Sequence, residues 1–175
     1  MLCFIGLGSN KGDRLGHLRA AVARMAAHGL TPVRVSGVFE TSPVGCPEPQ
    51  QDYLNAVVSI ETHLDPAALV AAALEIERAL GRVRTGHNAP RSVDLDVLLM
   101  GGTVSADAAA TVPHPRMHER LFVLAPLRDI AADVVHPVRG MRIEELYAAC
   151  VRARRETVKL FAPGIALREQ EYHAA

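Results

Sequence analysis

The sequence predicts an α+β fold in which helices pack on one face of an antiparallel sheet. Three observations support this prediction. Apolar and polar residues alternate over 53–61, which is typical of a strand with one buried face. Apolar residues recur at helical spacing over 15–25 and 69–80. In chain order the segments run strand, helix, strand, strand, helix, strand, which is the ferredoxin-like arrangement.

The composition is that of an ordinary globular protein. The chain has 175 residues, of which 49% are hydrophobic and 22% are charged, and this length is enough for one sizeable core. We therefore expect a single domain over 1–175, with 156–175 as a C-terminal tail of undefined role. The formal net charge is zero, which argues against a nucleic-acid-binding protein, where a basic surplus is expected.

We also expect a cytoplasmic protein that does not associate with membranes and is a monomer or a weak homo-oligomer. Cys3, Cys46 and Cys150 are odd in number and match no metal or redox motif, which fits reduced thiols. The N-terminus has no basic leader before its short apolar run. No apolar stretch approaches the roughly 20 residues that span a bilayer.

Local signals predict the elements of the first half. Residues 2–7 form a short apolar strand that ends in the turn-rich stretch 8–13. The helix over 15–25 is followed by a strand over 33–39. Residues 41–51 contain three prolines and should form an irregular loop, because proline supplies no ladder donor.

The second half continues this order. The second helix begins with an aspartate cap and a proline at its first position, and it ends at Gly81. The loop 82–90 leads into a strand over 91–100. Beyond a loop-like stretch, helices are expected over 117–127 and 143–153.

Two carboxylates in the strand over 91–100 are its most informative residues. Asp94 and Asp96 lie on one face of the strand, with Cα atoms roughly 6.5–7 Å apart. The opposite, apolar face is formed by Val93, Leu95, Val97 and Leu99. Two like charges this close repel unless water, a cation or protonation offsets the repulsion. Because Mg²⁺ prefers hard oxygen ligands and accompanies phosphates, the pair indicates a metal site. The alternative is a solvated acidic edge.

The alternation of two strands predicts where a pocket lies. If their apolar faces pack on the helices, Tyr53, Asn55, Asp94 and Asp96 share the uncovered face. The loops over 41–51 and 82–90 would roof this face, which is therefore the expected position of an active site.

Further residues near this face suit a phosphate ligand. Arg82, Arg84 and Arg91 bracket a loop that could close on a triphosphate, although a charged surface loop has the same composition. His114 lies between two prolines near Arg120 and could bind phosphate; alternatively it is a loop histidine without a role.

Aromatic and amide side chains suit a flat ring. Tyr53 and Phe122 could stack on a heterocycle, and Asn55 could pair with its edge. Core packing of the aromatics and a solvent-facing amide are the alternatives. The stretch 6–10 lacks the lysine and glycine spacing of nucleotide loops, so we interpret it as a strand ending in a tight turn.

Five motifs follow one another in a fixed order. They are Gly6-Leu7-Gly8-Ser9-Asn10, Asp52-Tyr53-Leu54-Asn55-Ala56, Gly81-Arg82-Val83-Arg84, Pro90-Arg91-Ser92-Val93-Asp94-Leu95-Asp96 and Val112-Pro113-His114-Pro115-Arg116-Met117-His118-Glu119-Arg120. In this order and spacing the chain resembles the 6-hydroxymethyl-7,8-dihydropterin pyrophosphokinase family of folate biosynthesis, from about Leu2 to about Leu146.

The resemblance implies a ferredoxin-like fold and an enzyme that transfers pyrophosphate from ATP to the pterin hydroxymethyl group, releasing AMP. It implies that Asp94 and Asp96 hold two Mg²⁺ ions on the co-substrate ATP, while Arg82 and Arg91 stabilise the transferring group. The implied ATP contacts are Glu77, Arg84, Thr111, His114 and Arg120. The implied pterin contacts are Thr41, Ser42, Val44, Tyr53, Asn55 and Phe122, with the two aromatic rings enclosing the pterin.

One departure from the family pattern concerns the catalytic loop. The family usually carries another Arg and a Trp-Gly pair before the Pro-Arg of this loop, whereas this chain has Gly86-His87-Asn88-Ala89 and no Trp. An aromatic lid excludes water and helps loop closure. Two alternatives follow: a relative that acts on a modified pterin, or a pterin-binding module without chemistry. The paired aspartates argue against the second alternative, because a neutral pterin needs no carboxylate pair.

Overall fold

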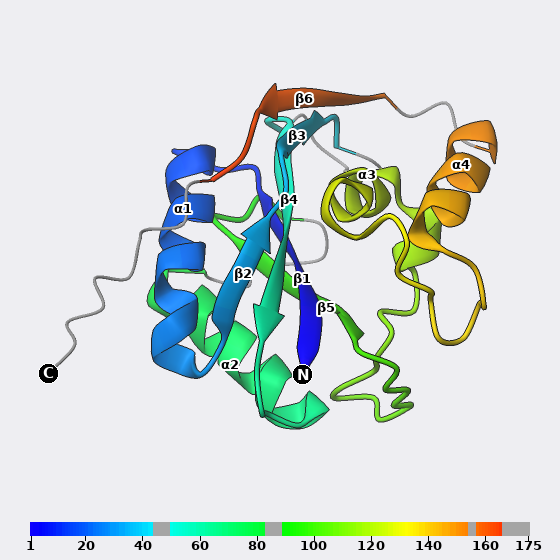
Figure 1. The fold of residues 1–175 in the computed structure, drawn as a ribbon. Helices are drawn as coiled ribbons and strands as arrows, with labels where there is room; N and C mark the ends of the chain where they lie inside the picture. Colours follow the sequence, from blue (N-terminus) through cyan, green and yellow to red (C-terminus); the bar gives the residue numbers. More distant parts are fainter. Residues whose placement is uncertain (44–49, 83–88, 154–156, 166–175) are drawn as a thin grey trace, which may run out of the picture.

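The computed structural model describes residues 1–43, 50–82, 89–153 and 157–165 (Figure 1). Its strands are β1 (Leu2–Ser9), β2 (Thr31–Val35), β3 (Val38–Thr41), β4 (Tyr53–Glu61), β5 (Asp94–Met100) and β6 (Val158–Ala162). Its helices are α1 (Arg14–Met25), α2 (Pro66–Ala79), α3 (Leu121–Ala131) and α4 (Ile143–Ala153), with 3-10 turns over Ala26–His28 and Met117–Glu119. None of the helices in these ranges is long and apolar enough to cross a membrane.

The strands of the described part form one antiparallel sheet in the order β5-β1-β4-β3-β6, with β2 also paired to β4. The strand expected over 33–39 is divided into β2 and β3, which lie along the same edge of β4. Ser36 occupies the break, where its hydroxyl accepts a hydrogen bond from the Val57 amide at 2.9 Å. Part of the expected tail forms β6, which extends the sheet beyond β3.

One face of the sheet is covered by α1 and α2, as the alternation predicted (Figure 1). Both helices begin at aspartate caps: Asp13 accepts from the Gly16 amide at 2.9 Å, and Asp65 accepts from the Ala68 amide at 2.8 Å. Their apolar stripes pack on β1, β4 and β5. The buried strand residues of this cluster include Ile5, Leu7, Leu54, Ala56, Val58, Ile60, Leu95 and Val97.

The other face is partly covered by α3, and α4 packs against α3 on the side away from the sheet (Figure 1). The antiparallel α+β fold is confirmed, but the sequence placed helices on one face only, and the structure adds this third layer. Its cause is a second set of apolar residues that point away from α1 and α2, among them Phe4, Val57 and Leu98. Helix α3, packed against α4, covers these side chains and leaves the remaining end of the face to polar residues.

A register shift explains the one error in the predicted apolar face of β5. Ile5 of β1 pairs with Val97, whereas Phe4 pairs with Leu99, so that Leu98 is an additional residue at a bulge. Leu98 and Leu99 therefore both pack against the α3 and α4 layer, and Met100 returns to the α1 and α2 layer. The assignment of Leu99 to the same face as Leu95 was wrong for this reason.

Two of the three cysteines are buried in the core. Cys3 lies in β1 and Cys150 lies in α4, and both side chains are buried. Burial raises the pKa of the Cys3 thiol, which keeps it protonated and unreactive. Cys46 lies outside the described residues.

Candidate active site

The polar end of the second face is organised in rows that cross three strands. In one row Asn55 of β4, Gly8 of β1 and Asp94 of β5 are paired neighbours. In the next row Gly6 separates Val57 from Asp96. The two aspartates and Asn55 thus lie on one face, and the central strand contributes only glycine between them.

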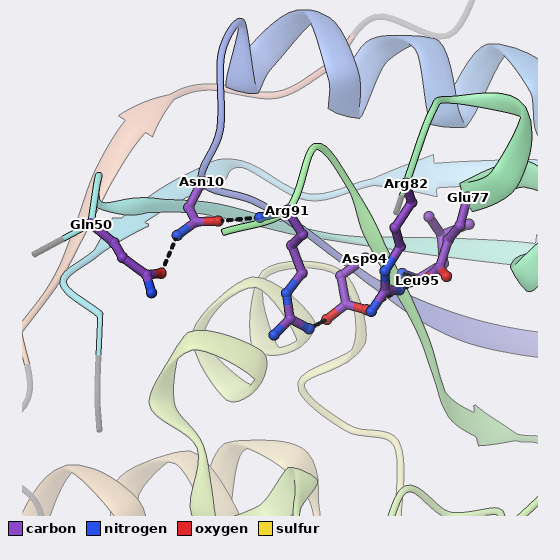
Figure 2. Close-up of polar contacts among 7 residues, drawn as sticks. All are labelled: Asn10, Gln50, Glu77, Arg82, Arg91, Asp94 and Leu95. Atoms are coloured by element: carbon purple, nitrogen blue, oxygen red, sulfur yellow. Dashed lines mark hydrogen bonds and ion pairs between the residues drawn. The ribbon is translucent and has the colours of Figure 1, made fainter. Parts of the chain in front are cut away.

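Asp94 is held by two arginines, one from each end of the loop that precedes β5 (Figure 2). Arg82 Nη1 lies 2.5 Å from Asp94 Oδ1, and Arg91 Nη1 lies 2.6 Å from Asp94 Oδ2. Each carboxylate oxygen therefore has its own guanidinium group. All three side chains are mostly shielded from solvent, which strengthens such charge-assisted bonds.

Glu77 connects helix α2 to the same group (Figure 2). Its Oε1 accepts a 2.7 Å hydrogen bond from the Leu95 amide and also forms an ion pair with Arg82. The side chain is only 2% exposed, and burial raises its pKa. Glu77 therefore fixes the start of β5 and orients Arg82, so that in this structure it acts on the site through these two residues.

Asp96 makes no hydrogen bond or ion pair with any residue of the described ranges. Its pKa is raised to about 6, chiefly by burial and next by the neighbouring charge of Asp94, while the surrounding arginines oppose this rise. A carboxyl group of this kind is easily protonated in the absence of a cation. It keeps free oxygen atoms for one when a cation arrives.

Asn10 connects the two loops that flank the site, although from its sequence context we expected only a turn residue. Its Oδ1 accepts from the Arg91 amide at 2.8 Å, and its Nδ2 donates to Gln50 Oε1 at 2.9 Å (Figure 2). Ser9 adds a 2.5 Å bond to the Ser92 carbonyl. Ser9, the last residue of β1, and Asn10, which follows it, are both buried and polar. The sequence signal for Ser9 and Asn10 is their position shortly after the apolar run 2–7, where two polar residues follow one another.

The residues expected to hold the pterin lie around β3 and β4. Asn55 Nδ2 donates to Thr41 Oγ1 at 2.8 Å, so these two are already joined. The phenol of Tyr53 interacts electrostatically with the Arg91 guanidinium, which places it near a residue expected to bind phosphate. Ser42 is exposed at the end of β3. Val44 lies outside the described residues.

The residues expected to hold ATP approach from the segment before α3. The His114 amide donates to the Leu98 carbonyl at 2.9 Å, which ties this segment to β5. The Arg120 guanidinium lies 5.5 Å from the centre of the Phe122 ring and faces the charge of Asp96. Thr111 donates its hydroxyl to the Asp107 carbonyl of its own loop. Arg84 falls outside the described residues.

His114 is a neutral hydrogen-bond donor in this setting. Its pKa is lowered to about 4, chiefly by burial and next by the positive charge of Arg120. Its Nδ1 accepts a hydrogen bond from the Arg116 amide at 3.2 Å, so the proton lies on Nε2. The ring can therefore donate to an anionic oxygen without carrying a charge.

The donor set fits Mg²⁺ that arrives with phosphates. Asp94 and Asp96 offer hard oxygen ligands on one face. Within the residues that the structure describes, no group of three or more His, Cys, Asp or Glu could hold a metal ion. Two carboxylates without a third ligand suit Mg²⁺, which usually takes its remaining ligands from water and substrate phosphates.

The fold and this site together define a class: an α+β protein with an acidic pair and clustered arginines suited to a metal-bound phosphate ligand. Residues 4–132 match the model of the family described as 7,8-dihydro-6-hydroxymethylpterin-pyrophosphokinase (HPPK), and the chain belongs to this family.

Individual relatives support the family assignment. The chain is 46% identical to the 2-amino-4-hydroxy-6-hydroxymethyldihydropteridine pyrophosphokinase of Bacillus subtilis over 134 residues, 76% of this chain and 80% of that protein. It is 42% identical to the protein of the same name from Methylorubrum extorquens, covering 83% and 90%. A Plasmodium falciparum HPPK-DHPS crystal structure with pteroate shares the fold, with a TM-score of 0.67 at 14% identity over 87% of this chain and 43% of that one.

Proposed function

We propose that this protein transfers pyrophosphate from ATP to the hydroxymethyl group of 6-hydroxymethyl-7,8-dihydropterin in folate biosynthesis, releasing AMP. The observation that supports this most strongly is the row that places Asn55 and Asp94 on either side of Gly8, with Asp96 one row further. Asn55, which can form hydrogen bonds with the edge of a ring, and Asp94, which can bind a cation, then lie on the same face.

Asp94 and Asp96 are the proposed metal ligands, and two Mg²⁺ ions bound there would neutralise the ATP phosphates and align them. Asp94 enters this role from its resting pairs with Arg82 and Arg91. On substrate binding, both guanidinium groups exchange the carboxylate for oxygens of the transferring group. The same arginines thus neutralise Asp94 at rest and stabilise developing phosphate charge during transfer.

The remaining phosphate contacts come from the segment before α3. His114 donates from Nε2 as a neutral ring, and Arg120 adds a positive charge near Asp96. A neutral donor holds a phosphate oxygen without competing for the acidic pair. Thr111 and Arg84 are proposed as further ATP contacts.

The pterin is proposed to bind beside β4. Tyr53 and Phe122 would enclose the flat ring, while Asn55, Thr41, Ser42 and Val44 would bind its edges. The hydroxymethyl oxygen then attacks the β-phosphorus of ATP. The new O–P bond forms as the bond between the β-phosphorus and the oxygen of the α-phosphate breaks; AMP leaves with that oxygen, and the hydroxyl proton is lost.

Phosphorus NMR of ATP, Mg²⁺, protein and 6-hydroxymethyl-7,8-dihydropterin tests the proposal. AMP and a pterin diphosphate are the expected products. ADP would indicate ordinary kinase chemistry and contradict the proposal. Pterin binding without turnover would favour the non-catalytic module instead.

A further inference from the structure

Two glycines of the central strand β1 lie beneath the site, and the space above them differs. Gly8 lies between Asn55 and Asp94, and Gly6 lies between Val57 and Asp96. Since adjacent strands are about 4.8 Å apart, the two outer Cα atoms of each row are about 10 Å apart. On this face the central strand carries no side chain, so each row is a trough with a backbone floor.

The two positions differ in what borders them. A Cβ atom at Gly6 would contact three atoms of the apolar Leu98 side chain at 3.4–3.6 Å, so core packing borders this position. A Cβ atom at Gly8 would meet only the two walls, Asn55 Oδ1 at 3.7 Å and Asp94 Cβ at 3.8 Å. Both are ordinary van der Waals distances.

Neither backbone geometry nor packing explains the glycine at position 8. Gly8 is not among the glycines with positive φ, so an alanine can adopt its backbone conformation. Its Cβ would clash with nothing, in contrast to Gly16, where it would come within 2.1 Å of Asp13 Oδ2. The fold therefore tolerates a methyl group at position 8, and the reason for its absence lies in what occupies the trough.

We propose that Gly8 is a specificity-determining residue whose missing side chain leaves the passage between Asn55 and Asp94 open to the substrate. A methyl group there would touch both walls and fill the gap between the ring-binding amide and the cation-binding carboxylate. The inference rests on the proposed function: the hydroxymethyl arm of the pterin crosses this gap to reach the phosphate. ATP approaches from the His114 side and does not need the gap.

The test compares Gly8→Ala with Gly6→Ala, a matched loss of glycine on the same strand and face. Binding of 6-hydroxymethylpterin is measured by fluorescence with saturating Mg²⁺ and a non-hydrolysable ATP analogue. Nucleotide binding is measured by calorimetry, and folding by the thermal midpoint. Filling a close-fitting space should weaken pterin binding and lower kcat/KM for the pterin by about 10- to 100-fold in Gly8→Ala. Nucleotide affinity and the thermal midpoint should stay at the wild-type values.

Gly6→Ala should retain both pterin affinity and the wild-type thermal midpoint, because its methyl group would lie at ordinary contact distance from Leu98. Wild-type pterin affinity in Gly8→Ala would overturn the inference. An unfolded Gly8→Ala variant would overturn it as well, because the position would then not be open. Failure of the wild-type protein to form AMP is a separate result, which would reject the proposed function before Gly8 is considered.

Discussion

The two faces of the sheet bury their residues differently, although the same strands supply both. Toward α1 and α2, side chains of β1, β4 and β5 form a continuous apolar layer from Cys3 to Leu95. On the other face the layer stops midway. Phe4, Val57 and Leu98 pack under α3 and α4, and beyond them come glycine, Asn55 and the two aspartates.

This difference shows how one strand can serve packing and chemistry in succession. Along the second face β1 changes from Phe4 to Gly6 to Gly8, so its side-chain volume falls to nothing where the acidic pair begins. Burial stabilises the covered end by about 25 cal/mol per Å² of apolar surface. The open end lacks this stabilisation from apolar burial, and charged groups lie near one another there instead.

The largest expected effect is on activity at the open end. Asp96→Ala should lower kcat by at least about 10³-fold, because the metal supplies several kcal/mol of charge stabilisation. The far-ultraviolet circular dichroism should be unchanged, since Asp96 bonds to no described residue. Asp133→Asn is the control: this carboxylate is 93% exposed and lies outside the site. Turnover by Asp96→Ala at the wild-type rate would remove the metal assignment.

The next effect separates the two roles of the arginines. Arg91→Met keeps the length of the side chain and leaves the backbone bond to Asn10 intact. We expect kcat to fall by about 10²- to 10³-fold, because a charged donor to the transition state is lost. Binding of Mn²⁺ without nucleotide should become several-fold tighter, since Asp94 loses one of its two counter-ions.

Calorimetry with Mn²⁺ alone measures this second effect. Arg142→Met serves as its control, because Arg142 is half-exposed and pairs with Asp133 and Glu145 outside the site. Unchanged Mn²⁺ affinity in Arg91→Met would contradict the proposal that the arginine exchanges the Asp94 carboxylate for phosphate oxygens.

A third substitution, two residues after Asp96 in β5, should lower stability and leave activity nearly unchanged. Leu98→Ala removes a fully buried side chain and should lower the free energy of unfolding by about 2–5 kcal/mol. Its kcat/KM should stay within a few-fold of wild type at a temperature where the variant is folded. Leu69→Ala truncates a fully buried residue of the first face and should behave alike. A selective loss of activity in Leu98→Ala would mean that the covered and open ends are not independent.

The smallest expected effect concerns pH, where two groups act in opposite directions. The folded-state pKa of Asp96 is raised to about 6, so its contribution to stability falls as pH rises from about 4 to 6. The folded-state pKa of His114 is lowered to about 4, so its contribution rises between about pH 4 and 6.5. In wild type the two slopes largely cancel.

Urea unfolding of the metal-free protein across this range separates them. Asp96→Asn should gain stability with rising pH, and His114→Gln should lose it, each by about 2–3 kcal/mol relative to wild type. If the free energy of unfolding varied with pH in the same way for both variants, Asp96 and His114 would not dominate the pH dependence of stability.

Local patterns were enough to predict the helix-covered face and the shared side of Asn55, Asp94 and Asp96, because side-chain alternation fixes both. The covering of the second face by α3 and α4 could not be predicted, since it depends on contacts between distant segments. The bulge at Leu98 was missed for the same reason: it arises from pairing with Phe4 and leaves no local mark in the sequence.

The roles of two residues required the assembled fold. Asn10 reads as part of a turn, and only the approach of Gln50 and Arg91 makes it a connection between loops. Glu77 reads as one more acidic residue of a helix, and only the position of Leu95 shows why it is buried. In both cases the partner lies many residues away, so spacing along the chain carries no signal.

The two ion pairs between Asp94 and the arginines have a consequence for the binding of free metal ions. A carboxylate that already has two counter-ions offers little to a stray calcium or zinc ion. A nucleotide that brings its own cation also supplies phosphate oxygens as new partners for both arginines. Cation binding at Asp94 therefore depends on the nucleotide and the cation arriving as one complex. Such a protein would ignore fluctuations in the free-ion pool and respond to charged nucleotide instead.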